Sequence, residues 1–288
     1  MNREQRKTQL VRVARLALRS ARRCVAPYGS IKSRKDFTQR QLVVCLVLKA
    51  VTRSDYRGIC ELLTLSPALC EAIGLEKVPH FTTLQKFSSK PGTLEIVDAM
   101  IGQVLEEAGV TDLPVEVAAD STGMRNGVAS VHYQTRQWGE GGTRRKPVKI
   151  STAVICGALL PAALVVDMGS SADMKQMPAL MEQIEARVTP ACLLADRGYD
   201  AEWVHEVCRE RWKAESFIPP VARSADGSIK SRWRAQMREL PAVFGRRWHA
   251  ESFFSALKRT MLSTISSRTE RTMVAEAAIK VLAYALRR

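Results

Sequence analysis

The sequence lacks the short motifs that most often accompany a nucleotide cofactor. Its 288 residues contain neither a G-x-x-x-x-G-K-S/T phosphate-binding loop nor a G-x-G-x-x-G turn placed after a strand. Its seven cysteines form no C-x-x-C pair, and several of them, such as Cys45, lie within apolar runs. We interpret the cysteines as small buried residues of a protein in a reducing compartment, in preference to a zinc or disulfide framework.

Long apolar segments are missing as well. The longest uncharged apolar stretch is residues 153–166, and Gly157 and Pro161 interrupt it, whereas a membrane span needs about 20 residues. We therefore expect this stretch to form core strands, and we expect no membrane partner. No uninterrupted apolar segment typical of a secretory signal is present near the N-terminus. The first 23 residues are Arg-rich, which is compatible with an organellar transit helix but also with a nucleic-acid-binding arm.

Negative charge is scarce, with 29 Asp and Glu residues against 44 Lys and Arg residues and a formal net charge of +15. Residues 1–40 carry 12 basic and 2 acidic side chains, and residues 229–288 carry 13 basic and 4 acidic side chains. The middle of the chain, 41–228, has a net charge of −4. Such an excess of positive charge favours a polyanionic partner, either nucleic acid or an anionic membrane, over a neutral small molecule.

The first 110 residues are predicted to be helical. Apolar residues recur at helical spacing over 10–21, and Thr38 is predicted to cap a second helix that runs to about residue 51. Short helices joined by tight turns are compatible with a helix-turn-helix, but also with a purely structural helical lobe. The remaining predicted helices cover 56–63 and a segment after Pro79 that Thr82 or Thr83 would cap.

The pattern changes at Pro114, where strands begin to alternate with helices. A short strand over 115–119 ends at Asp120, a polar loop follows over 121–147, and two strands then form a hairpin. The element order from there is that of the ribonuclease H-like fold, a mixed sheet with flanking helices. We therefore predict an α/β domain preceded by an all-α N-terminal region. The predicted elements after the loop are strands at 148–155, 159–166, 191–195 and 216–218, and helices at 174–188, 201–212, 246–261 and 269–287.

Two aspartates occupy equivalent places, at the C-terminal ends of two predicted core strands. Asp120 follows the strand at 115–119, and Asp196 follows the strand at 191–195. Ligand sites of open α/β sheets gather outside the carboxyl ends of strands, so the two carboxylates would converge if the strands are neighbours. Converging carboxylates repel unless a cation neutralises them, and oxygen ligands suit Mg²⁺. The plainer alternative is that each aspartate caps a turn.

A third acid lies on a predicted helix near the C-terminus. At about 100° per residue, four residues of this helix fall on one stripe, with an acid flanked by cations. An exposed i,i+4 ion pair would explain Arg247 and Glu251 but not Lys258. An acidic metal ligand between two phosphate-binding cations would explain all of them. The stripe consists of Phe244, Arg247, Glu251 and Lys258.

These residues resemble the signature of DDE-type insertion-sequence transposases from bacteria and archaea. The run from Phe244 to Lys258 is similar to their Y-x2-R-x3-E-x6-K motif, with Phe244 in place of the tyrosine. The segments that begin at Asp120 and Asp196 are similar to the family's two aspartate motifs. The resemblance covers about residues 36–288. The 54 residues between Asp196 and Glu251 leave little room for the large β insertion of some relatives.

The resemblance implies a ribonuclease H-like DDE catalytic domain over 111–288 and a helical DNA-binding region over 1–110. It implies metal-dependent cleavage at element ends and strand transfer by transesterification, with two Mg²⁺ ions, for which Mn²⁺ can substitute. The implied partners are double-stranded DNA, namely terminal inverted repeats and target, and a second copy of the chain in the DNA complex. The implied location is the cytoplasm of a bacterium or archaeon, at the nucleoid. The implied catalytic and metal-binding residues are Asp120, Asp196 and Glu251. The DNA-binding residues would be Arg247, Lys258, Arg144, Arg145, Lys146 and Lys149.

Two alternatives stay open. A catalytically inactive DNA-binding protein derived from a transposase would keep the basic flanks, although the intact acid triad argues against it. A ribonuclease H-like nuclease, such as a resolvase, would cut DNA without joining it. Among single residues, Asp173 and Asp200 are predicted to cap helices, and the basic loop that contains Arg144 could equally be a solvated face.

Overall fold

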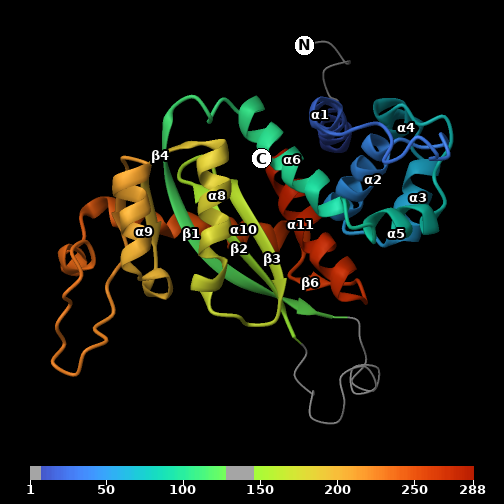
Figure 1. Ribbon diagram of the computed structural model, residues 1–288. Helices are drawn as coiled ribbons and strands as arrows, with labels where there is room; N and C mark the ends of the chain where they lie inside the picture. Colours follow the sequence, from blue (N-terminus) through green and yellow to red (C-terminus); the bar gives the residue numbers. More distant parts are fainter. Residues whose placement is uncertain (1–7, 128–145) are drawn as a thin grey trace, which may run out of the picture. The chain divides into compact units, whose positions relative to one another are not determined.

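The computed structural model describes residues 8–127 and 146–288 (Figure 1). The chain divides into two compact units, which are described separately. The first unit comprises the described residues of Met1–Val104 and Arg125–Arg145 together with Leu257–Arg288, and the second comprises Leu105–Met124 and Lys146–Ala256. The C-terminal segment therefore returns to the unit in which the chain begins.

Helices form the N-terminal part of the first unit, as predicted. In α2 (Gln39–Thr52), Thr38 and Gln41 form a capping box, so two backbone N–H groups at the helix start are satisfied. The pattern did not predict α4 or α6, and the side chain of His80 caps α5, so the assignment of that cap to Thr82 or Thr83 is wrong. The other helices of this part are α1 (Gln9–Cys24), α3 (Tyr56–Thr64), α4 (Pro67–Ile73), α5 (Phe81–Ser88) and α6 (Thr93–Glu107).

The C-terminal residues complete the first unit. α11 (Glu270–Arg287) agrees with the predicted helix, is buried over most of its length and packs against α1 and α2. The short strand β6 (Thr264–Ile265) pairs in parallel with Arg125 and Asn126. Among the helices of the described residues, none is long and apolar enough to cross a membrane.

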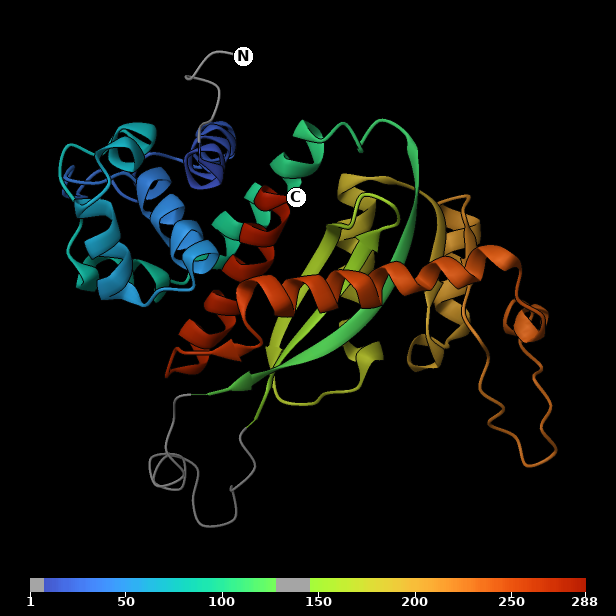
Figure 2. The same cartoon turned by 180° about the vertical axis from the view of Figure 1, so that it is seen from behind.

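The second unit is built on a mixed sheet with the strand order β3-β2-β1-β4-β5. The central strand β1 pairs antiparallel with β2 and parallel with β4, and β2 pairs antiparallel with β3 (Figures 1 and 2). Every residue of β2 is buried, as expected for a strand covered on both faces. The strands are β1 (Pro114–Asn126), β2 (Val148–Ile155), β3 (Leu160–Met168), β4 (Thr189–Ala195) and β5 (Glu215–Phe217).

Helices cover both faces of this sheet. α8 (Met177–Arg187) and α9 (Glu202–Glu206) lie on the face turned to the viewer in Figure 1. The second-unit part of α10 (Trp248–Met261) lies on the opposite face, which Figure 2 shows. Ala250, Phe253 and Phe254 of α10 are buried. A mixed sheet flanked by helices, preceded by an α-helical region, confirms the predicted ribonuclease H-like class.

Local predictions differ from the structure at three aspartates. β1 continues beyond Asp120 because Ser121 to Met124 remain paired with β2 after β1 has left β4. Asp173 does not cap an α-helix, since a 3₁₀ turn (Asp173–Gln176) precedes α8. Asp200 does not cap α9 either, because Ala201 holds that position. The rest of the predicted polar loop, from residue 128 to 145, lies outside the described residues.

All seven cysteines are free thiols. Cys45 is buried in the first unit, and Cys192 and Cys208 are buried in the second. Burial raises the pKa of Cys192 and of Cys208 to about 12, and it raises the pKa of Cys45 as well. These thiols therefore stay protonated at neutral pH, as the apolar sequence around them predicts.

Candidate active site

The pairing register of β1 and β4 brings the first two acids together. The last parallel pair of the ladder is Ala119 with Ala195, and the next residue of each strand is an aspartate, Asp120 and Asp196. Adjacent strands lie about 4.8 Å apart, so the two backbones hold these carboxylates at neighbouring positions. On its other side, Asp120 pairs with Thr152 of β2. The predicted convergence of the two aspartates follows from this register.

The environment of Asp120 shows that negative charges meet here. The pKa of Asp120 is raised, first by burial and further by the carboxylates of Asp196 and Glu251. Two groups lower it in part, the backbone N–H of Ser121, which donates to Asp120 Oδ1 at 2.8 Å, and the cation of Arg247. Bringing a positive ion to this place would therefore stabilise the ionised form.

Arg247 connects the third acid to the first. Its Nη2 donates to Glu251 Oε1 at 2.5 Å, and its Nη1 lies 3.9 Å from Asp120 Oδ2. The i,i+4 ion pair thus exists, but its cation also faces the sheet acid. Arg247 and Phe244 belong to a 3₁₀ segment (Ala242–Arg247) that precedes α10, so the helical stripe at about 100° per residue holds only from Trp248 onward.

A fourth carboxylate lies beside the two sheet aspartates. Asp173 Oδ1 accepts a hydrogen bond from Ser121 Oγ at 2.5 Å. A methyl group placed on Gly198 would lie 3.0 Å from Asp173 Oδ2 and 3.0 Å from Asp196 Oδ1, so both carboxylates crowd this glycine. The pKa of the fully buried Tyr199 is raised, first by burial and then by the charges of Asp173, Asp120 and Asp196.

Lys149 neutralises this fourth carboxylate. Its ammonium lies 2.6 Å from Asp173 Oδ1 and also donates to the Ser171 carbonyl, and only 6% of the residue is exposed. The sequence predicted Lys149 on the DNA backbone and Asp173 at a helix cap. In the structure the two side chains pair with each other, because the 3₁₀ turn that contains Asp173 follows the β2–β3 hairpin on which Lys149 lies.

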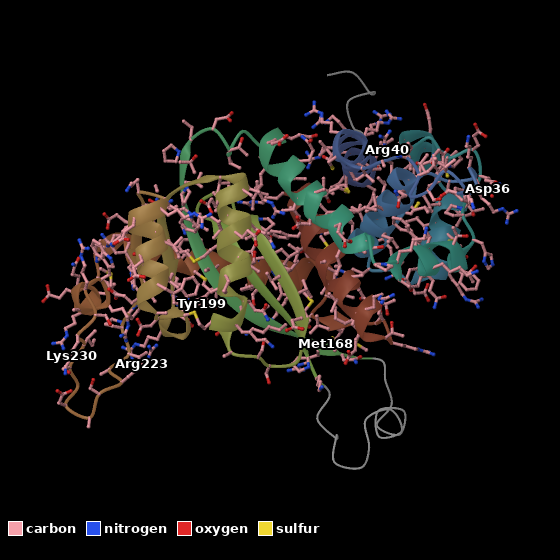
Figure 3. All side chains as sticks on the ribbon, in the orientation of Figure 1. Asp36, Arg40, Met168, Tyr199, Arg223 and Lys230 are labelled. Atoms are coloured by element: carbon pink, nitrogen blue, oxygen red, sulfur yellow. The ribbon has the colours of Figure 1, made fainter. Side chains whose placement is uncertain are left out.

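A buried ion pair secures the segment that follows Asp196. Asp200, of which 1% is exposed, accepts hydrogen bonds from Arg234 Nη2 at 2.6 Å and from the Val221 N–H at 2.7 Å. Burial acts to raise the pKa of Asp200, but these donors outweigh it and hold the pKa below its usual value. Arg223 donates to the Asp200 carbonyl. Arg223 and Lys230 lie on the excursion after β5, which we define as residues 218–233 (Figure 3). This excursion is therefore tied to the second aspartate motif.

The remaining basic residues are placed as follows. Lys258 lies on α10, seven residues after Glu251, and its pKa is lowered by burial and by the nearby Arg125. Arg125, an exposed residue near the end of β1, was not among the predicted site residues. Lys146 is exposed, whereas Arg144 and Arg145 lie outside the described residues.

The donor set fits a hard divalent cation in its chemistry. Asp120, Asp196 and Glu251 offer only oxygen, and a positive guanidinium already lies between two of them. Within residues 8–127 and 146–288, no three acidic, histidine or cysteine side chains are close enough together to hold an ion. Glu251 Oε1 accepts from Arg247.

The mixed sheet and the helices on its two faces define a ribonuclease H-like domain. The sequence matches the family model described as the transposase DDE domain over residues 112–286. This match spans more than half of the chain, and the chain belongs to the DDE transposase family. DNA is accordingly its partner. A search of curated proteins finds no match for the chain.

Proposed function

We propose that the chain is the transposase of an insertion sequence, which cleaves DNA at the ends of its element and joins the freed strand to target DNA. The observation that carries the proposal is the shared register of Asp120 and Asp196, with Arg247 connecting Asp120 to Glu251. In this proposal residues 111–288 are the catalytic domain, and residues 1–110 form a helical region that binds terminal-repeat DNA.

Asp120, Asp196 and Glu251 would hold a pair of Mg²⁺ ions, for which Mn²⁺ can substitute. When bound, the metal would lower the pKa of the attacking hydroxyl and neutralise charge on the phosphate. Ser121 and Arg247 contribute by orientation: the Ser121 N–H fixes one oxygen of Asp120, and the Arg247 guanidinium fixes one oxygen of Glu251. Lys149 pairs with Asp173, and Asp173 in turn accepts a hydrogen bond from the Ser121 hydroxyl.

The chemistry requires two displacements at phosphorus. In the first, water attacks the scissile phosphodiester, a P–O bond to water forms, and the P–O3′ bond breaks to release a 3′-OH. In the second, that 3′-OH attacks a phosphodiester of the target, and the target's own P–O3′ bond breaks. The number of phosphodiester bonds is conserved in the second step, so no nucleoside triphosphate is consumed.

Basic side chains would hold the phosphates. Arg247 keeps donors in addition to those used on Glu251, because a guanidinium has five N–H groups. Burial and the nearby cation of Arg125 lower the pKa of Lys258, and a phosphate bound there would favour the charged ammonium. Lys146, Arg144 and Arg145 would track the DNA backbone. In the DNA complex we propose a homodimer.

The Glu251→Gln variant tests the proposal. We expect it to bind a duplex that carries the element's ends, taken from inverted repeats flanking the open reading frame, with the affinity of the unchanged protein. We expect cleavage with Mg²⁺ to fall by at least a hundredfold, because one negative oxygen ligand is lost. Glu270→Gln, the same change at an exposed position, is the control and keeps full activity.

Other outcomes distinguish the alternatives. Normal cleavage by the Glu251→Gln variant would show that the site is assigned to the wrong residues. An unchanged protein that binds but never nicks DNA would be a DNA-binding derivative of a transposase. Hydrolysis products without joined products in a strand-transfer assay would indicate a nuclease.

A further inference from the structure

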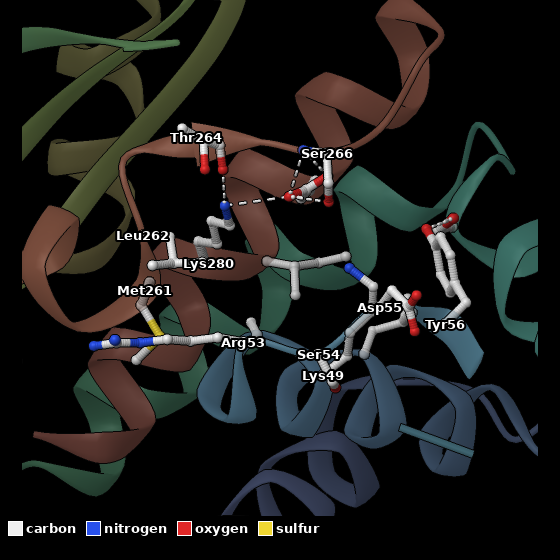
Figure 4. A pocket seen from close by; sticks show the side chains of 15 residues that line it. Lys49, Arg53, Ser54, Asp55, Tyr56, Met261, Leu262, Thr264, Ser266 and Lys280 are labelled. Carbon is white, nitrogen blue, oxygen red and sulfur yellow. Dashed lines mark hydrogen bonds and ion pairs between the residues drawn. The ribbon is translucent and has the colours of Figure 1, made fainter. Parts of the chain in front are cut away.

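The first unit contains a cavity of about 160 Å³ whose lining includes none of the acids of the candidate active site. It is lined on one side by α2 and the start of α3, and on the other by residues 261–266 and α11. Figure 4 shows its side chains. We call it the Lys49 cavity. Its charged lining residues are three cations and two acids, namely Lys49, Arg53, Lys280, Asp55 and Glu276.

Both acids of the Lys49 cavity accept hydrogen bonds from the protein itself. Glu276 accepts from the Ser266 N–H at 3.1 Å, from the Ser267 N–H at 2.8 Å and from the Ser266 hydroxyl at 3.1 Å. Lys280 pairs with the same carboxylate at 3.2 Å and donates to the Thr264 carbonyl at 2.5 Å. Asp55 caps α3 by accepting from the Gly58 N–H at 2.7 Å.

Arg53, one of the cations, is engaged as well. Its guanidinium donates to the carbonyl of Thr260 at 2.9 Å and to the carbonyl of Arg259 at 2.7 Å. These are the last carbonyls of α10, which have no partner within the helix. Arg53 and Lys280 therefore serve the protein's own backbone and carboxylate.

Lys49 differs from the other cations. Only 9% of the residue is exposed, and its ammonium lies 4.7 Å from the centre of the Tyr56 ring. Within the described part of the chain, this ammonium has no hydrogen bond and no ion pair, although it has three donors. The Tyr56 hydroxyl forms a hydrogen bond with the Ser88 hydroxyl at 2.7 Å and none with the Lys49 ammonium. Burial acts to raise the pKa of Glu276, and the charges of Lys280 and Lys49 outweigh it, so Lys49 has an opposite charge nearby. Its ammonium donates no hydrogen bond to that carboxylate, and an anion in the cavity would accept from these donors.

We infer that the Lys49 cavity binds a phosphate group, with Lys49 as its principal ligand. At about 160 Å³ the cavity is smaller than sites for drug-sized ligands, which occupy about 300–1,000 Å³, and its volume suits one tetrahedral oxyanion. The lining also includes Ser54 and Tyr56, whose hydroxyls are hydrogen-bonded to Thr52 and Ser88. The phosphate belongs either to a DNA backbone or to free inorganic phosphate. This site is separate from the proposed cleavage chemistry.

The first test is thermal and needs neither DNA nor catalysis. Inorganic phosphate at about five times its Kd raises the Tm of the unchanged protein by about 2–4 °C relative to chloride of equal ionic strength. In the Lys49→Met variant the response disappears, because the ammonium that would bind the anion is gone. Lys49→Arg retains the charge and part of the response. Lys86→Met, at an exposed position of α5, responds like the unchanged protein.

The second test identifies the source of the phosphate. The slope of log K against log salt is measured for a DNA duplex with the unchanged protein and with Lys49→Met. If a DNA phosphodiester enters the cavity, the slope decreases in magnitude by about 0.9. If the slope is unchanged while the thermal response depends on Lys49, free phosphate is the ligand. A protein whose Tm ignores phosphate and whose slope ignores Lys49 would overturn the inference, whatever the outcome for Glu251→Gln.

Discussion

A single methyl group at Gly198 tests whether the acids must stay where the structure places them. In Gly198→Ala the new Cβ would lie 3.0 Å from Asp196 Oδ1 and 3.0 Å from Asp173 Oδ2. Contacts this short are tighter than nine in ten real ones, so the two carboxylates must move by a few tenths of an ångström. The backbone at Gly198 lies outside the left-handed region, so alanine itself is not strained there.

The expected effect on rate follows from that displacement. A misplacement of about 1 Å costs roughly a hundredfold in rate, so a few tenths of an ångström correspond to about a five- to tenfold loss. Stability should change little. Alanine restricts the unfolded chain and so contributes about 0.4–1 kcal/mol, which offsets the cost of the crowded contacts. The free energy of unfolding should therefore stay within about 1 kcal/mol of the original value.

The assay is the initial rate of Mg²⁺-dependent cleavage of an end-containing duplex at saturating protein, with the Tm measured in parallel. Gly92→Ala is the matched control, because its new Cβ would come no closer than 3.9 Å to another residue, at Glu95 Oε2. If Gly198→Ala cleaves at the original rate, crowding of Asp196 and Asp173 does not affect cleavage, and their orientation does not limit it.

Two further predictions concern the buried ion pairs. Lys149→Met and Asp173→Asn should be coupled by about 0.5–3 kcal/mol in a double-mutant cycle of chemical unfolding, because the two groups share one ion pair; additive effects would contradict that pairing. Asp200→Asn should destabilise the protein by about 3–5 kcal/mol, since it leaves Arg234 buried without its charge partner, whereas Asp226→Asn, at an exposed acid, should cost far less. Because folding lowers the pKa of Asp200, its contribution is complete above about pH 4 and is lost as the pH falls through the folded-state pKa. Unfolding measured between about pH 5 and 2 should therefore show a shallower loss in Asp200→Asn, and an identical pH profile would contradict the assignment.

Much of the fold was predictable because local signals and tertiary packing agree. Thr38 caps α2 as its sequence predicts, and β2 has the predicted bounds of 148–155. The end of β1 was not predictable. Polar residues after Asp120 are typical of a loop, but pairing with β2 extends the strand. Helix α4 was missed because its seven residues are too few for a periodic pattern.

In the candidate site too, some features could be predicted from the sequence and others depend on tertiary contacts. Two acids at the ends of apolar strands could be predicted because strand order in such sheets brings strand ends together. The pairing of Lys149 with Asp173 could not, because it depends on how the hairpin and the following turn fold over the sheet edge. Arg247 was assigned to a helical stripe, yet the 3₁₀ segment sets its direction. Contacts between residues distant in sequence produce no periodic pattern in the sequence, so they cannot be predicted from it.

The buried thiols are natural probes of local opening, because their reaction rates depend on how often their surroundings open. A thiol that is protonated and shielded reacts with an alkylating reagent only while its surroundings are open. Cys45 reports on the first unit, whereas Cys192 and Cys208 report on the second. Mass spectrometry of the alkylated protein over time would give the rate at which each cysteine is modified. A comparison with and without DNA would show in which unit DNA slows local opening, and it needs no label introduced into the chain.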